Sequence, residues 1–467
     1  MDRDKKRRRQ SLKVIISEAI MVVAVIITVI ILAFVVSGYW LNSDFKVERQ
    51  GLLQVYSIPT GADVSIDGET SSWLQRTNTS KTLTGGKHTI TLSKEGYDSW
   101  SKDINLSEGL LYRLHYPRLF LKDRISEKVL DASDVTMATI SPDFSDMVII
   151  NNTTKWSLLN LENDTLEPKN LNIADYFTDV SVAEGASTGL FEGKILDLNW
   201  DADCNHILFE IEGDAGSEWV LIDVRNIKNS INLSKEFGVN FSEVKILDNS
   251  SNNLLAIQNG NLHKIDTSSK SISAVIVENV IDFDHYNNTV LFSAEDENAE
   301  YYMGLLKVGD GKITKLTTSS RQFKVAIAKF YDDFYYATID NQTVSLYKES
   351  PEFSKVSDYE LSFAPDHQKV GQAGEFIIMY LGSHIATLDM EANAVREWDI
   401  ENNTFDWVAN EMIFTVSDGE LIVYDFDGYN RRTLAKNVSS HFPASITNDK
   451  WLYYFSDDTL VREQLVK

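Results

Sequence analysis

The stretch MIFTVSDGELIVYDFDGYNRRTL, residues 412–434, shows the unit from which most of the chain is built. The apolar run Met412 to Val416 is followed by the turn pair Asp418-Gly419 and by a further run from Leu421 to Tyr424. Another turn then leads to a final short strand ending near Leu434. Short apolar runs bounded by turn residues are typical of antiparallel strands.

Similar runs recur along the chain at intervals of about 36 to 59 residues. They lie at residues 147–150, 206–209, 253–257, 289–292, 334–337, 376–380, 412–416 and 451–455. A strand is expected before each run, often ending in a polar turn such as Ser141-Pro142-Asp143 or Asn199–Asp203. Four short antiparallel strands per unit, repeated radially, predict a β-propeller over residues 121–467.

The last unit, ending in Thr459–Glu463, is one strand short. A strand from the region 119–129 could complete it and close the ring. The repeats therefore predict eight blades, with seven as the alternative. Ser141-Pro142-Asp143-Phe144 and residues 421–434 resemble the blade repeats of the Tol system's periplasmic protein and of prolyl oligopeptidases. This resemblance extends only to the repeats and implies no particular activity.

Residues 51–120 have a different pattern, with alternating apolar residues around Pro59, Gly61 and Asp67-Gly68. It predicts a strand pair at 53–56 and 64–66 joined by a tight bend, and further strands at 87–92 and 100–106. The aromatic residues Trp73 and Trp100 could form a ligand platform, but burial is the favoured interpretation.

The order S-x-P-T-G-A from Ser57, V-x-I-D-G from Val64 and L-T-G-G-K-H-T-I-T-L-x-K-E-G-Y from Leu83 resembles a PEGA domain, a small β-sandwich module. Thr79-Ser80 stands where the family often has Thr-Pro. The resemblance implies a role in the cell envelope or in surface display, and it implies no catalytic residue.

The N-terminal region carries the run AIMVVAVIITVIILAFVV, residues 19–36, with Thr28 as its single polar side chain. Its length matches the hydrocarbon layer of a bilayer, so residues 14–40 are predicted to be a transmembrane helix. The basic residues of the tail, 1–13, place that tail in the cytoplasm, and residues 41–50 are expected to be a connector. A cleaved signal peptide is the alternative, but the run is long and Val36-Ser37-Gly38 is a poor cleavage site.

The formal charge is −25, and beyond Lys13 the 37 basic and 67 acidic residues give −30. Such an acidic ectodomain repels phosphate backbones, which excludes nucleic acid as a partner. Cys204 is the single cysteine, so no intramolecular disulfide can form. A large ectodomain without disulfides indicates a bacterial protein.

Motifs for chemistry are sparse. Residues 185–189, GASTG, fit G-x-S-x-G but lack the strand and helix of a nucleophile elbow, so a loop is expected. The eight histidines lie singly, at positions 88, 115, 206, 263, 285, 367, 384 and 441, without zinc-ligand spacing. The pairs Asp201/Asp203, Asp282/Asp284 and Asp425/Asp427 could bind calcium, although capping of turns is favoured. No catalytic, metal or cofactor residue is assigned.

The sequence therefore predicts a protein of the cell membrane, held by a single N-terminal span, with an extracytoplasmic all-β ectodomain. The favoured function is binding: the propeller recognises an envelope protein or polysaccharide and the PEGA-like module acts as a spacer. The alternative is an extracytoplasmic propeller hydrolase or lyase acting on glycan. A cluster of Asp, Glu, His or Tyr side chains at the mouth of the central channel would favour the enzyme.

Overall fold

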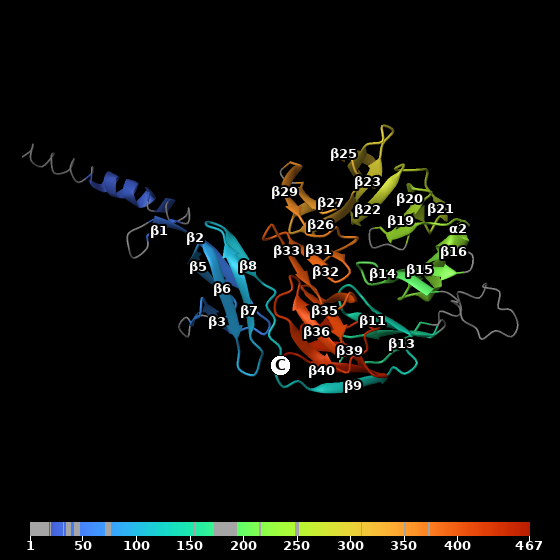
Figure 1. Cartoon of the computed structure of the whole chain (residues 1–467), viewed down its shortest axis with the longest axis horizontal. Helices are drawn as coiled ribbons and strands as arrows, with labels where there is room; N and C mark the ends of the chain where they lie inside the picture. The colour runs from blue at the N-terminus through green and yellow to red at the C-terminus, as the bar shows by residue number, and fades with distance from the viewer. Residues whose placement is uncertain are drawn as a thin grey trace, which may run out of the picture. The chain divides into compact units, whose positions relative to one another are not determined.

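The computed structural model describes two units, residues 1–122 and 123–467, each considered by itself (Figure 1). The described residues are 18, 20–30, 32–33, 39–41, 47–70, 76–152, 155–171, 194–213, 216–247, 252–309, 311–349, 352–371 and 374–467. The GASTG motif and Trp73 lie outside them.

The N-terminal apolar run is helical over residues 20–30, and its large side chains there are exposed. Within the residues that the structure describes, no helix has both the length and the apolar character needed to cross a membrane. Tyr39 and Trp40, which we expected to extend the spanning segment, instead lie in strand β1 and pair with Arg49 and Glu48.

In its described residues, the first unit contains two four-stranded sheets. One consists of β1 (Tyr39–Leu41), β2 (Val47–Val55), β5 (Thr79–Thr84) and β8 (Leu111–Leu114). The other consists of β3 (Asp63–Ile66), β4 (Glu69–Thr70), β6 (Gly86–Ser93) and β7 (Trp100–Leu106).

Three features of this unit differ from the sequence prediction. The expected pair at 53–56 and 64–66 is not a hairpin, because β2 and β3 belong to different sheets. Strands β5 and β8 were not predicted. Residues 47–50 were expected to end the connector, but they form the first part of β2. They pair there with β1 and β5, and the later part of β2 pairs with β5 and β8.

The two sheets pack through their apolar faces. Strand β7 alternates strictly between buried and exposed residues, and Trp100 at its start is fully buried, which confirms the interpretation of burial. Gly51 lies so close to β7 that a Cβ atom there would come within 2.7 Å of the Leu106 side chain. The close approach of the sheets therefore requires glycine at this position.

The second unit consists, in its described residues, of eight four-stranded antiparallel sheets arranged around a centre (Figure 1). The first four are β10 (Met137–Ile140), β11 (Asp146–Asn152), β12 (Lys155–Asn160), β13 (Lys169–Asn170); β14 (Lys194–Trp200), β15 (His206–Gly213), β16 (Gly216–Asp223), β17 (Ile231–Asn232); β18 (Glu243–Ile246), β19 (Asn253–Gln258), β20 (Asn261–Asp266), β21 (Ser271–Ile272); and β22 (Val280–Tyr286), β23 (Thr289–Glu295), β24 (Tyr301–Lys307), β25 (Lys312–Ser319). The second sheet also carries the short helices η2 (Ile227–Asn229) and α2 (Leu233–Phe237).

The other four sheets follow in chain order. They are β26 (Lys324–Phe330), β27 (Asp333–Asp340), β28 (Thr343–Lys348), β29 (Ser354–Glu360); β30 (His367–Val370), β31 (Phe376–Leu381), β32 (His384–Asp389), β33 (Ala394–Asp399); β34 (Phe405–Ala409), β35 (Met412–Ser417), β36 (Glu420–Asp425), β37 (Arg432–Lys436); and β38 (Ser445–Thr447), β39 (Trp451–Ser456), β40 (Thr459–Gln464), which pairs with β9 (Ser126–Asp131).

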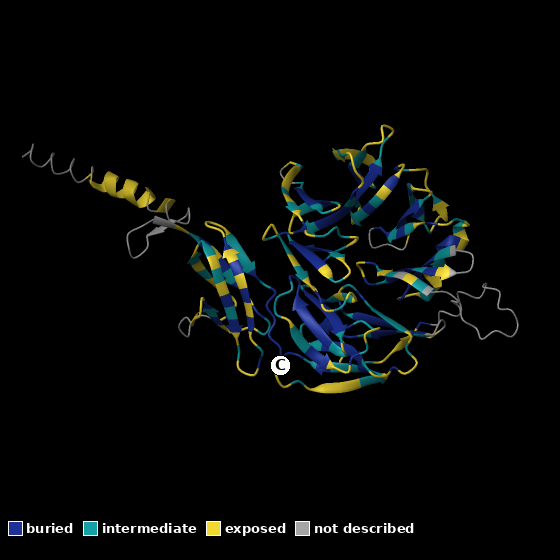
Figure 2. Ribbon diagram, in the orientation of Figure 1, coloured by how far each residue is buried: buried dark blue, intermediate teal, exposed yellow. Residues whose placement is uncertain are grey.

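Each apolar run found in the sequence overlaps the second strand of one sheet, from β11 to β39. These strands are hydrogen-bonded on both edges and mostly buried on both faces, which explains why they are continuous apolar runs rather than alternating ones (Figure 2). The apolar clusters lie between sheets: Ile207 and Phe209 of the second sheet, for example, pack with Val148 and Trp156 of the first.

The ring closes where β40 pairs with β9, a strand from the start of the unit. The expected completing strand is therefore present, with bounds 126–131. Arg124, just before β9, donates from Nε to Glu463 Oε1 at 2.5 Å and from Nη2 to the carbonyl of Leu434 at 2.7 Å. Tyr454 donates to the other oxygen of Glu463 at 3.1 Å. The buried Glu463 carboxylate thus ties the first and last segments of the ring together.

In the first unit, His88 of β6 contacts Asp67, in the turn after β3, and Thr84, the last residue of β5 in the other sheet. Its Nδ1 contacts Asp67 Oδ2 at 2.8 Å and its Nε2 contacts the carbonyl of Thr84 at 2.8 Å, while Asp67 also accepts from Thr89 N. The hydrogen bonds from His88 and Thr89 lower the pKa of Asp67. Burial lowers the pKa of His88, but its hydrogen bonds to Asp67 and Thr84 outweigh burial and the pKa is raised.

Replacing Arg124 by Ala is expected to lower the free energy of unfolding of the propeller by about 2–4 kcal/mol, because it leaves Glu463 buried without its cation. Lys355→Ala, which breaks an exposed pair with Asp358, is the control and should cost less than about 1 kcal/mol. Urea denaturation followed by tryptophan fluorescence measures both. Equal losses of unfolding free energy in the two variants would contradict the role assigned to the Arg124–Glu463 pair in closing the ring.

The Asp67–His88 pair should make the stability of the first unit depend on pH. The contribution of Asp67 is present above its ordinary pKa of 3.8 and is lost as pH falls through the lowered value. That of His88 is present below its ordinary pKa of 6.5 and is lost as pH rises through the raised value. His88→Gln should therefore destabilise the unit more at pH ~6 than at pH ~9, by less than about 1 kcal/mol because Asp67 is half exposed. Equal effects in thermal unfolding at the two pH values would contradict this.

Candidate functional site

A cavity of about 620 Å³ lies along the inner strands of the propeller. Its wall comes mainly from the first strands of the second to sixth sheets, β14, β18, β22, β26 and β30, and from the turns that follow some of them. A volume of this size is typical of sites for small ligands or for short segments of a polymer.

The inner strands present polar side chains to the cavity by simple alternation. In β18, Glu243 and Lys245 are partly exposed, whereas Val244 and Ile246 are buried against neighbouring sheets. In β22, Phe283 is fully buried between the partly exposed Asp282 and Asp284. Because side chains of a strand alternate between its faces, a charged residue at every second position gives a polar wall over an apolar interior.

Lys245 stands at the centre of a group of oxygen atoms. Its Nζ lies 3.2 Å from Glu243 Oε1 and 3.9 Å from Asp284 Oδ1, and it donates to the carbonyl of Phe283 at 2.5 Å. The ammonium also lies 4.6 Å from the centre of the Phe283 ring. Lys245 therefore offsets part of the negative charge of these carboxylates.

Asp282 and Asp284 also connect two sheets. Asp282 Oδ2 accepts from the backbone N–H of Val325 at 2.7 Å, and Asp284 Oδ2 accepts from that of Ile327 at 3.0 Å. Gln368 of the sixth sheet contacts Asp282 at 3.4 Å and donates to the Val325 carbonyl at 3.0 Å. These aspartates, considered from the sequence as calcium ligands or turn caps, thus lie in an inner strand and hold β26 against β22.

The charges in the cavity shift one another's pKa values. Burial raises the pKa of Glu243 and of Asp282, although Lys245 opposes this in both cases. For Lys245, burial lowers the pKa, but the carboxylates of Asp284, Glu243 and Asp282 together outweigh burial and the pKa is raised. Lys245 therefore stays charged, and Glu243 holds a proton more readily than an exposed glutamate.

The C-terminal end of β22 adds an aromatic surface. Tyr286 lines the cavity and is 36% exposed, and its ring packs edge-on against Phe334 with 5.8 Å between ring centres. The ammonium of Lys329 lies 5.9 Å from the centre of the Tyr286 ring and 5.7 Å from that of Phe334. An exposed ring beside a cation provides a flat surface with donors at its edge.

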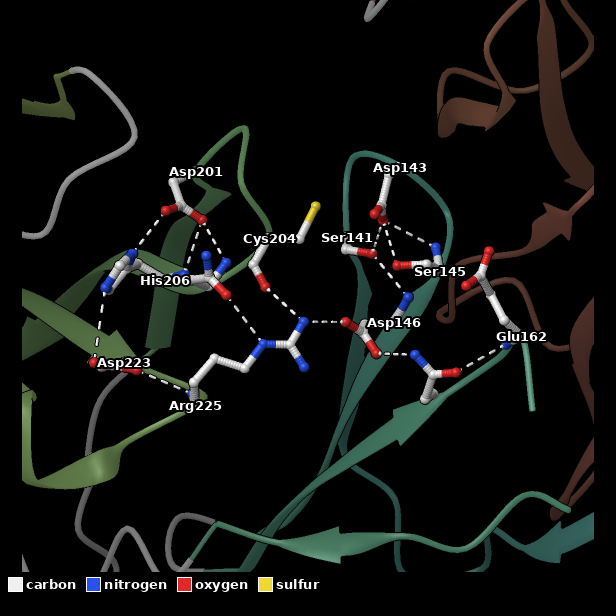
Figure 3. A network of polar contacts seen from close by, with 12 residues as sticks. Ser141, Asp143, Ser145, Asp146, Glu162, Asp201, Cys204, His206, Asp223 and Arg225 are labelled. Atoms are coloured by element: carbon white, nitrogen blue, oxygen red, sulfur yellow. Dashed lines mark hydrogen bonds and ion pairs between the residues drawn. The ribbon is translucent and has the colours of Figure 1, made fainter.

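A polar network joins the first and second sheets at the turns that the sequence singled out (Figure 3). Arg225 donates to Asp146 Oδ2 at 2.7 Å and to Asn205 Oδ1 at 3.0 Å (Figure 3). His206 contacts Asp201 at 2.6 Å and Asp223 at 3.8 Å. Asp201 also accepts from two backbone N–H groups of its turn, so capping, the interpretation favoured for it, is what the geometry shows.

The other predicted residues lie in turns and in the interior. Asp425 and Asp427 are buried and accept from Asn430 Nδ2 and from the backbone of Tyr429. In the turn after β10, Asp143 accepts from Ser141 and Ser145. Cys204 is buried in the turn after β14, and burial raises the pKa of its thiol to about 12.

The sequence analysis missed Glu243, Lys245, Tyr286 and Lys329. Their signal is present in the sequence as charged residues two apart, Glu-x-Lys at 243–245 and Asp-x-Asp at 282–284, in strands that directly precede apolar runs. Charged residues at that spacing in a strand near the axis of a ring indicate a wall of the channel.

Lys245→Met is expected to lower the free energy of unfolding of the propeller by about 2–3 kcal/mol, because it leaves like charges close together in a poorly solvated cavity. Adding Glu243→Gln to this variant should restore part of the loss, since it removes one of the stranded carboxylates. Chemical denaturation of the single and double variants measures this. A double variant no more stable than Lys245→Met would contradict the charge balance described here.

The thiol of Cys204 should be unreactive in the folded protein. With burial and a pKa of about 12, almost no accessible thiolate exists near pH 8. A disulfide reagent should label the native chain only as fast as the second sheet opens, and should label the chain at once in denaturant. Immediate labelling of native protein would contradict the placement of this turn.

Comparisons with known proteins agree with the two units. The family model of the PEGA domain matches residues 50–117. No curated protein has a sequence that matches the chain. Among solved structures, the Dos1 propeller has 11% identity and a TM-score of 0.43, with 73% of this chain and 93% of that one covered.

Two further structures are similar at the same low level. The β-propeller domain of Cps50 (Swd1) from Myceliophteria thermophila has 8% identity and a TM-score of 0.40, with 67% of this chain and 100% of that chain covered. An oligogalacturonate lyase from Vibrio parahaemolyticus has 12% identity and a TM-score of 0.34, with 58% and 98% covered. The chain thus contains a PEGA domain at residues 50–117, followed by a β-propeller.

Proposed function

We propose that this chain is a membrane-anchored, extracytoplasmic binding protein of the bacterial cell envelope. In this proposal an eight-bladed propeller recognises an envelope protein or polysaccharide, and the PEGA domain acts as its spacer. The apolar helix with exposed side chains supports the anchor, and the basic tail in front of it supports the orientation. The acidic ectodomain argues against nucleic acid as a partner.

The observation that carries the proposal is the polar cavity at the propeller axis. Its charged groups are positioned before any ligand arrives, because they project from inner strands that are fixed by hydrogen bonds to neighbouring strands. Groups that are already ordered cost little further entropy when a ligand binds, which favours recognition.

Binding accounts for the carboxylates of the cavity better than catalysis does. Asp282 and Asp284 are engaged by backbone N–H groups of β26, and Asp201 by His206 and its own turn. A carboxylate that holds two sheets together is poorly placed to exchange protons with a substrate. These aspartates support a rigid wall.

One observation favours the second candidate, a glycan hydrolase or lyase. Glu243 has a raised pKa and lies 3.2 Å from the ammonium of Lys245 in the same cavity, and a carboxyl group with a raised pKa is a candidate for general acid–base catalysis. Turnover of envelope polysaccharide that is abolished by Glu243→Gln, in a variant with unchanged unfolding, would establish the enzyme and overturn the binding assignment.

The binding assignment is tested with the full chain in detergent, immobilised and exposed to envelope extracts. Tyr286→Ala and Lys329→Gln should each reduce the amount of the captured component several-fold. Lys307→Gln, an exposed lysine in β24 away from the cavity wall, is the matched control and should change nothing. Capture that is insensitive to both cavity variants would refute recognition at this cavity.

The orientation is tested separately, with protease added to intact spheroplasts. The proposal expects digestion of the PEGA domain and propeller and protection of the basic tail. Protection of the C-terminal region with digestion of the N-terminus would refute the anchor and its direction.

A further inference from the structure

We infer that the ligand of the propeller cavity is an uncharged, hydroxyl-rich glycan segment. This inference rests on the proposed function and specifies the chemistry of the ligand. It follows from the charge of the cavity, from the position of Lys245 and from the side chains that line the wall.

The cavity carries a small net negative charge, because ammonium groups offset part of the charge of its carboxylates. Its described lining includes the carboxylates of Asp201, Glu243 and Asp284 and the ammoniums of Lys245 and Lys329, and the carboxylate of Asp282 lies beside this group and interacts with Lys245. An anionic ligand approaching it must first meet an ectodomain with a net charge of −30 beyond Lys13. Long-range electrostatics therefore disfavour uronic acid chains and phosphorylated polymers.

A cationic ligand is disfavoured for a different reason. The strongest focus of negative charge in the cavity, between Glu243 and Asp284, already holds the ammonium of Lys245. A cationic group of a ligand would have to displace a side chain that also donates to the Phe283 carbonyl. The cation position of this wall is filled by the protein itself.

The wall also lacks what a peptide segment needs. Peptide recognition depends on apolar pockets that accept anchoring side chains. Apolar residues such as Val244 and Val325 do line the cavity, but they are packed between sheets and no more than 2% exposed, so they offer little surface to an anchoring side chain. Among the residues of β18 and β22 that line the cavity, the charged Glu243, Lys245 and Asp284 are more exposed than Val244 and Ile246.

An uncharged polyol fits this wall in two ways. Each hydroxyl both donates and accepts, so neighbouring hydroxyls can be satisfied by a carboxylate and an ammonium that lie side by side, as Glu243 and Lys245 do. The exposed ring of Tyr286 offers a flat apolar face for the C–H side of a sugar ring, with Lys329 beside it as a donor.

The test uses the full-length chain in detergent on an array of glycans that includes neutral hexose chains and matched chains bearing uronic acid or sulfate. We expect binding to at least one neutral glycan. Tyr286→Ala and Lys329→Gln should each weaken it roughly tenfold, which is the size expected for loss of one aromatic or charged contact. Lys307→Gln, outside the cavity lining, should bind as the wild type does.

Thermal unfolding of the three variants checks that each is folded before binding is compared. Absence of glycan binding, binding to acidic glycans alone, or binding that both cavity variants leave intact would overturn the inference. The proposed function has its own outcome: if the cavity variants abolish capture of an envelope protein while no glycan binds, binding at the cavity stands and the glycan inference falls.

Discussion

The constraint on which the propeller depends is that none of its sheets can bury its own apolar residues. The apolar clusters combine residues of two neighbouring sheets: Leu208 packs with Leu254, Leu291 with Val325, and Ile378 with Ile413. The last and first sheets share a cluster as well, in which Tyr453 and Phe455 pack with Met147 and Ile149. In a closed ring every sheet has a neighbour on both sides, so all apolar faces are buried. An open array would leave the outer faces of its two end sheets in water.

The same constraint explains which part of the fold could be predicted from the sequence. The second strand of each sheet lies between two partners and two packed faces, so its residues are apolar almost without interruption and its period is visible. The ring closure could be anticipated because Thr459–Glu463 needed a partner, which β9 supplies. In the first unit, by contrast, β8 pairs in parallel with β2 about sixty residues away, a long-range contact that local alternation does not reveal.

The candidate site was harder to predict for a related reason. The side chain of Asp282 is held by a hydrogen bond from the backbone N–H of Val325, which belongs to the next sheet. Lys245 likewise forms its ion pair with Asp284 only because the third and fourth sheets lie side by side. A sequence shows that these residues are charged and two apart, but their partners are set by the ring. The role of turn aspartates such as Asp201 was easier to predict, because their hydrogen-bond partners lie within the same turn.

Lys245 has a consequence that concerns the surroundings of the protein. Carboxylates gathered around a central point are commonly neutralised by calcium, whose occupancy follows the concentration of the free ion. An ammonium carried on the chain is always present at one equivalent and cannot be diluted away or removed by a chelator. The positive charge that Lys245 contributes to this cavity is thereby independent of the calcium content of the medium.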